Sequence, residues 1–151
     1  LLLVPVEAFL SVALFVGLVA IGLPVLPGGR GGLAPFTTPS AGFIIGFPFA
    51  AAAVAMIAVA LRRAREPRTP RGQIALGATA SLLGGVAVLY AIAIPLGAMI
   101  GGISVAKFAR VTYVYLPGDI AKAVVASVVA AAVVRAAPFL APRTVRGETG
   151  A

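Results

Sequence analysis

Apolar residues along this chain gather into four long runs, which are separated by short segments rich in glycine, proline or arginine. The runs cover about residues 6–23, 41–61, 74–95 and 117–137. A helix needs roughly 20 apolar residues, at about 1.5 Å each, to cross the hydrocarbon core of a bilayer. The pattern therefore predicts an all-α membrane protein, a bundle of about four transmembrane helices.

The segments between the runs are irregular for identifiable reasons. Residues 27–32 read PGGRGG, which is too rich in glycine for regular structure. Pro48 lies inside the second run, where we expect a kink because proline removes a backbone donor. Residues 103–115 carry Lys107 and Arg110 and are too short and too charged to span a bilayer. We expect them to form a helix or loop at the outer membrane interface.

The amino-acid composition also indicates a membrane protein. Hydrophobic residues make up 61% of the chain, charged residues 11%, and the mean hydropathy is +1.11. A soluble domain has roughly a quarter of its residues charged. We therefore expect residues 1–151 to form a single membrane domain, of which residues 138–151 are a basic cytoplasmic tail.

The net charge of +8 comes from arginines placed beside the apolar runs. Five arginines lie between residues 62 and 71, and Arg135, Arg143 and Arg146 follow the last run. The connection between the first and second runs and the one between the third and fourth runs together carry only Arg30, Lys107 and Arg110. Positive residues favour the cytoplasmic side, which predicts a multi-pass cell-membrane protein with a cytoplasmic C-terminus. This distribution argues against nucleic acid as a partner, because no basic face with interleaved aromatics remains.

Several kinds of chemistry lack their usual residues. The chain has no cysteine and no histidine, and its four acidic residues are scattered at Glu7, Glu66, Asp119 and Glu148. These absences argue against a metal centre, a cofactor and a paired-carboxylate site, so we do not expect an enzyme.

Candidate binding residues converge on the outer side. Asp119 and Lys122 lie three apart at the start of the last run, so they share a helix face and suit a small ligand with donors and acceptors. A local ion pair that compensates the helix dipole is an equally good explanation. Arg30 is either a solvated loop residue or a ligand contact, and Tyr90 is either a hydrogen-bonding pocket residue or a packed aromatic.

Three segments resemble the BioY family, the biotin-specific S components of energy-coupling-factor transporters. They are GLPVLPGGRGG at residues 22–32, PSAGFIIGF at residues 39–47 and YLPGDIAK at residues 115–122. They follow the family order and spacing, and the resemblance covers nearly the whole chain from Pro5 to Ala137.

The resemblance implies a six-helix fold in which the four runs are the third to sixth helices. The first two helices would then be missing before Leu1, and we expect that the chain starts inside a longer reading frame. It also implies biotin as ligand, bound at an outward-facing pocket. A membrane coupling subunit and two ATPase subunits are the implied partners, together with the lipid bilayer.

Position by position, the resemblance places Asp119 and Lys122 on the ureido ring of biotin. Arg30 and nearby backbone N–H groups would meet the carboxylate, although the reverse assignment is nearly as good. Gly28, Gly29 and Gly31 would shape the lid over the pocket. Phe43 stands where the family commonly has tyrosine, so a hydroxyl contact is lost there.

Two other interpretations remain open. The chain could be an S component or small transporter for another vitamin or metabolite, or a structural membrane protein that transports nothing. The identity of a ligand retained on purification distinguishes a carrier of another vitamin or metabolite from a biotin carrier. The absence of any ligand-dependent thermal shift would indicate a structural membrane protein that transports nothing.

Overall fold

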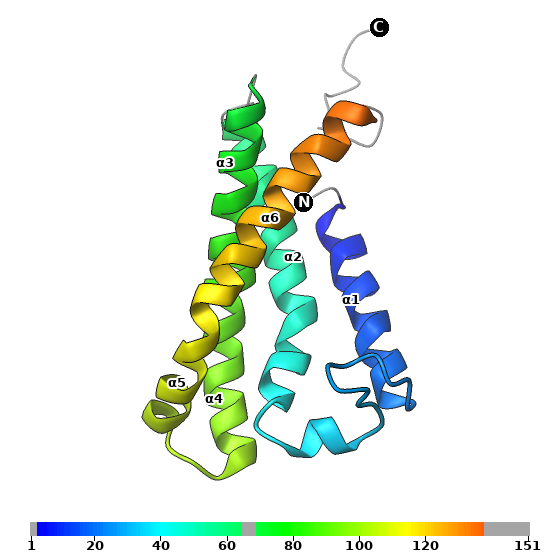
Figure 1. Ribbon diagram of the computed structural model, residues 1–151, viewed down its shortest axis with the longest axis vertical. Coiled ribbons are helices and arrows are strands. Elements are labelled where there is room, and N and C mark those ends of the chain that lie inside the picture. Colours follow the sequence, from blue (N-terminus) through cyan, green and yellow to red (C-terminus); the bar gives the residue numbers. More distant parts are fainter. Residues whose placement is uncertain (1–2, 65–68, 138–151) are drawn as a thin grey trace, which may run out of the picture.

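The chain folds into long helices that run between two ends of the molecule (Figure 1). A computed structural model describes residues 3–64 and 69–137, and within these ranges the regular structure is helical apart from one antiparallel bridge between Leu26 and Arg30. The predicted all-α class is confirmed. The α-helices are α1 (Pro5–Ala20), α2 (Ala41–Ala64), α3 (Pro70–Ala80), α4 (Leu89–Gly101), α5 (Val105–Thr112) and α6 (Leu116–Ala136).

Shorter helical segments join several of these helices end to end. A π-helical segment, η2 (Ser81–Val88), connects α3 to α4, and a 3-10 turn, η3 (Tyr113–Tyr115), connects α5 to α6. Three helical stretches are therefore long and apolar enough to cross a membrane: Ala41–Ala64, Arg71–Gly101 and Val105–Ala136. The apolar helix α1 is shorter, at 16 residues. These four units correspond to the four predicted runs.

The predicted boundaries were wrong at the ends of the third and the first runs. The third run continues to Gly101, because Pro95 is held inside α4 and the helix stops only where Gly102 adopts φ +59°. The segment predicted as a helix or loop forms a helix over residues 105–112, and the Ser104 hydroxyl caps it by accepting a hydrogen bond from the Lys107 N–H at 3.3 Å. Helix α1 also ends three residues before the predicted residue 23, where Gly22 turns the chain with φ +109°.

Helix α2 lies at the centre and packs against α1, α3, η2 and α4, while α6 packs against α3 and η2. Small residues make these approaches close. A Cβ added to Gly42 would lie 2.7 Å from the backbone N of Gly97, and one added to Gly84 would lie 2.7 Å from the Cα of Val54. Neither position has room for a side chain, so glycine sets the spacing of α2 from α4 and η2.

The two ends of the bundle carry different segments (Figure 1). The loop from α1 to α2, the turn from α4 to α5 and the start of α6 lie at one end. The end of α2, the start of α3 and the end of α6 lie at the other, and they bring Arg62, Arg63, Arg71 and Arg135 with them. The predicted division of the chain by side therefore agrees with the fold. Arg65, Arg68 and the tail at 138–151 lie outside the described residues.

Candidate ligand-binding site

A pocket of about 820 Å³ lies between α1, α2, η2 and the helical stretch made of α5, η3 and α6. Most of the side chains that line it are apolar. The residues around it are Val12, Phe15, Leu26, Pro27, Arg30, Ser40, Phe43, Ile44, Phe47, Ala50, Ala51, Val54, Ser81, Gly85, Val86, Leu89, Phe108, Val111, Thr112, Tyr115, Asp119, Lys122, Ala123 and Ala126.

One face of α2 forms a wall of the pocket. The lining positions Phe43, Ile44, Phe47, Ala50, Ala51 and Val54 recur at intervals of three and four, which places them along one stripe of a helix. Ser40, immediately before the helix, extends the same stripe toward the α1–α2 loop. The side chains of this stripe on α2 are apolar, with large ones at Phe43 and Phe47 and small ones at Ala50 and Ala51. Such a surface can accept an elongated apolar group.

The opposite wall is one face of the α5–η3–α6 stretch. Thr112, Tyr115, Asp119, Lys122 and Ala126 line the pocket at spacings of three and four, as one continuous helical stretch requires. Thr112 and Tyr115 were missed as pocket residues from the sequence, because the last span was expected to start at residue 117. Counting back from Asp119 by four and seven residues would have found both.

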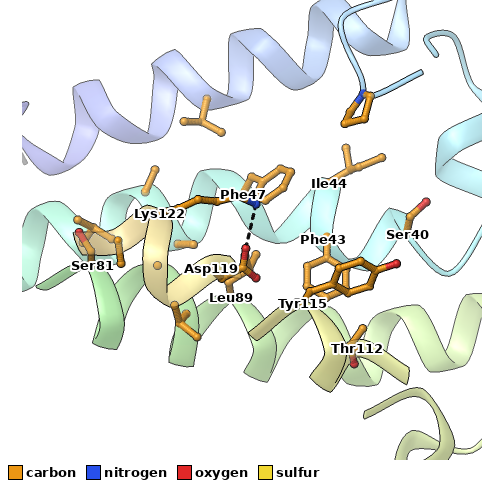
Figure 2. Close-up of a pocket in the computed structure, with 18 of the residues that line it drawn as sticks. Ser40, Phe43, Ile44, Phe47, Ser81, Leu89, Thr112, Tyr115, Asp119 and Lys122 are labelled. Atoms are coloured by element: carbon orange, nitrogen blue, oxygen red, sulfur yellow. Dashed lines mark hydrogen bonds and ion pairs between the residues drawn. The ribbon is translucent and has the colours of Figure 1, made fainter. Parts of the chain in front are cut away.

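Asp119 lies at the centre of a small polar cluster. The Tyr90 hydroxyl donates to its Oδ2 at 2.7 Å, and the Lys122 ammonium donates to its Oδ1 at 3.1 Å. Figure 2 shows the ion pair of Asp119 with Lys122 among the apolar side chains of the pocket. The expected shared face of these two residues is confirmed. Each carboxylate oxygen keeps a further lone pair, so Asp119 can still accept hydrogen bonds from a ligand.

Exposure distinguishes the two charged groups. The Lys122 side chain is 81% exposed and that of Asp119 is 24% exposed. A pair this exposed contributes at most about 1 kcal/mol to stability, because water screens it. Both charged groups remain accessible from the pocket that they line.

Tyr90 is a packed aromatic that also makes a hydrogen bond to a pocket residue. Its ring meets Phe43 edge to face, with centroids 5.4 Å apart and an interplanar angle of 87°, and its hydroxyl binds Asp119. Phe43 in turn packs against Phe108, with centroids 6.4 Å apart. Tyr90 is not among the residues that line the pocket. Its link to the pocket is through Asp119 and Phe43.

The glycine-rich loop places Arg30 at the pocket. Gly28 and Gly29 have φ of +81° and +67°, a region that other residues rarely adopt, and the loop closes through the bridge between Leu26 and Arg30. The Arg30 Nε donates to the Pro27 carbonyl at 3.2 Å, and Arg30 lines the pocket. Gly28, Gly29 and Gly31 do not line it. They shape the turn that carries Arg30.

Comparisons with known proteins agree with the resemblance noted in the sequence. The family described as the BioY family matches residues 1–139. The biotin transporter BioY of Rhizobium etli is 39% identical over 139 residues, which are 89% of this chain and 71% of that protein. The probable biotin transporter BioY of Bacillus subtilis is 37% identical over 132 residues, 87% of this chain and 67% of that protein.

A solved structure shares the fold. It is the crystal structure at 2.1 Å of the S-component for biotin from an ECF-type ABC transporter. The two structures superpose with a TM-score of 0.73 at 30% sequence identity, over 89% of this chain and 68% of that chain. The helical arrangement described above is therefore that of a known class of transporter subunit.

Proposed function

This chain belongs to the BioY family, and we propose that it is the membrane subunit that binds biotin for uptake by an energy-coupling-factor transporter. Transport subunits of this family bind their substrate without changing it, so the chain is not an enzyme. The observation that carries the proposal is the cluster of Asp119, Lys122 and Tyr90 on the wall of an otherwise apolar pocket of about 820 Å³.

Biotin has a polar part and an apolar part, as the pocket does. Its ureido ring offers two N–H donors and a carbonyl acceptor, and its alkyl chain is apolar. Asp119 can accept from a ureido N–H, while Lys122 can donate to the ureido carbonyl. The apolar walls on α2 and α6 then enclose the rest of the ligand, and specificity comes from the few polar groups.

The carboxylate of biotin remains to be placed, and we assign it to Arg30 and the backbone N–H groups of its loop. Arg30 lines the pocket from the α1–α2 loop, which also carries Ser40, whereas Ser81 belongs to η2. A guanidinium suits a carboxylate because it presents paired donors. Gly28, Gly29 and Gly31 support this contact by allowing the turn that carries Arg30. Phe43 contributes an apolar face and also packs against Tyr90.

The reverse assignment, in which Lys122 meets the carboxylate, makes a different prediction. Biotin methyl ester has the ureido ring but no carboxylate charge. With our assignment, Arg30→Gln weakens binding of biotin but leaves binding of the ester nearly unchanged. Lys122→Met weakens binding of both ligands. If instead Lys122→Met weakens binding of biotin alone and Arg30→Gln weakens binding of both ligands, the reverse assignment is correct.

We further propose that the pocket opens to the outside and that both the α2–α3 loop and the C-terminus are cytoplasmic. The support is the set of arginines at one end of the bundle, Arg62, Arg63, Arg71 and Arg135, opposite the end that carries Arg30. A separate membrane coupling subunit and two ATPase subunits would drive release of biotin into the cell. The cell membrane is the location that this orientation implies.

Equilibrium binding of biotin to the purified protein tests the proposal. We expect binding by the native protein and at least about a tenfold weaker affinity in Asp119→Asn and Lys122→Met, because each variant removes a charge-assisted hydrogen bond. Glu7→Gln and Lys107→Met are matched controls, since both side chains are exposed and away from the pocket. Unchanged affinity in both pocket variants would remove these residues from the site. Binding of another vitamin in preference to biotin would contradict the function.

A further inference from the structure

A second, much smaller cavity lies where α2, α3 and α6 meet, and it shares no lining residue with the ligand pocket. Its volume is about 10 Å³, and it is lined by Arg62, Gln73, Gly77, Ser127, Ala130, Ala131 and Val134. Arg62 belongs to the last turn of α2, Gln73 to the first turns of α3 and Ser127 to the second half of α6. Three separate helices therefore bring one polar side chain each to the same point.

Two polar atoms at this cavity are buried without a partner among the described residues. They are the Nε of Arg62 and the Oε1 of Gln73, both shielded from solvent. The first is a hydrogen-bond donor and the second is an acceptor, so the two atoms are complementary. Buried polar atoms are rarely left unpaired, because losing water without gaining a partner is costly.

Ser127 supplies a third polar group. Its side chain is 1% exposed, and its hydroxyl donates to the Ala123 carbonyl at 2.6 Å. The hydroxyl proton is therefore used within α6, and the oxygen keeps its capacity to accept a hydrogen bond. The cavity thus presents one donor and two acceptors.

We propose that one ordered water molecule occupies this cavity and joins the three helices. The water accepts a hydrogen bond from the Arg62 Nε–H and donates to the Gln73 Oε1 and the Ser127 Oγ. A buried water typically makes about three hydrogen bonds, and it needs roughly 10–15 Å³ of accessible volume. The cavity of about 10 Å³ holds one water and excludes phosphate, carboxylate or any larger anion.

This site has a consequence for the fold. A guanidinium at the end of α2 is joined through the water to polar groups of α3 and α6. The water thus fixes the arginine-bearing end of the bundle, where α6 packs against α3. The site does not depend on which ligand fills the larger pocket.

A crystal structure of the protein at the 2.1 Å resolution of its relative tests the proposal. We expect density for a single water within hydrogen-bonding distance of Arg62, Gln73 and Ser127. A direct hydrogen bond between the Arg62 Nε and the Gln73 Oε1, without density between them, would overturn it. So would density for a larger ion.

Thermal unfolding of variants gives an independent measurement. Arg62→Met and Gln73→Met keep side-chain length and remove the polar group, so each should lower the melting temperature. Because both variants break the same bridge, the double variant should lose clearly less than the sum of the single losses. Arg63→Met is the matched control, since Arg63 is exposed and does not line the cavity. Additive losses would show that no shared water couples the two side chains.

Discussion

The hydrogen bond from Tyr90 to Asp119 offers a sharp test of how the pocket is organised. It is 2.7 Å long and joins α4 to α6 across 29 positions of sequence. Tyr90→Phe removes a single oxygen and keeps the ring that packs edge to face on Phe43. The walls of the pocket therefore stay in place, and only the hold on the Asp119 carboxylate is lost.

The expected effect on binding follows from the freedom that Asp119 regains. Ordering one side chain on binding costs about 0.5–1.5 kcal/mol, which corresponds to an increase of about 2- to 12-fold in the Kd for biotin. The unliganded protein should also lose stability, because a hydrogen bond to a charged group contributes about 1.5–3 kcal/mol where it is buried. Tyr90 is only half-buried, so we expect the lower end of that range.

Isothermal titration with biotin measures the first effect, and thermal unfolding without ligand measures the second. Tyr113→Phe is the control, since Tyr113 is 68% exposed and does not line the pocket. In an Asp119→Ala background, Tyr90→Phe should change the affinity no further, because the group that it positions is gone. An equal loss of affinity in both backgrounds, or no loss in the native background, would refute the positioning role.

Three further substitutions test the fold and the loop. Gly42→Ala should destabilise the protein by about 1–3 kcal/mol in thermal unfolding, because the new Cβ meets the backbone of α4, whereas Gly118→Ala has open space and should not. Thr69→Ala removes the hydroxyl that caps α3 and should cost about 1 kcal/mol, while the exposed Thr79→Ala within the same helix should cost little. Gly29→Ala forces a side chain into φ +67° and should strain the loop by about 1–2 kcal/mol, which would weaken biotin binding through Arg30; native affinity in this variant would contradict the role of the loop.

Features with a local cause could be predicted from the sequence. The four apolar units follow from run length, and the start of α2 at Ala41 follows from the irregular segment before it. The pairing of Asp119 with Lys122 follows from their spacing within one helix. Each of these depends on residues that are close in sequence, so helical periodicity alone determines them.

Other features depend on contacts that periodicity does not contain. The partner of Asp119 on α4 is 29 positions away, and only the packing of α4 beside α6 brings Tyr90 to it. The cavity between Arg62 and Gln73 needs three helices at once. The sequence of α5 does not separate a helix from a loop, because eight amphipathic residues lack the long apolar run of a membrane span. Its buried positions Phe108 and Thr112 are four apart, as a helix face requires.

The central claim is that biotin binds in the large pocket with its ureido ring at the polar cluster. A structure of the protein with biotin bound tests this most directly. Our account predicts a ureido N–H within hydrogen-bonding distance of the Asp119 carboxylate and the ureido carbonyl within reach of the Lys122 ammonium. Biotin bound outside this pocket, or in it with neither residue in contact, would contradict the account.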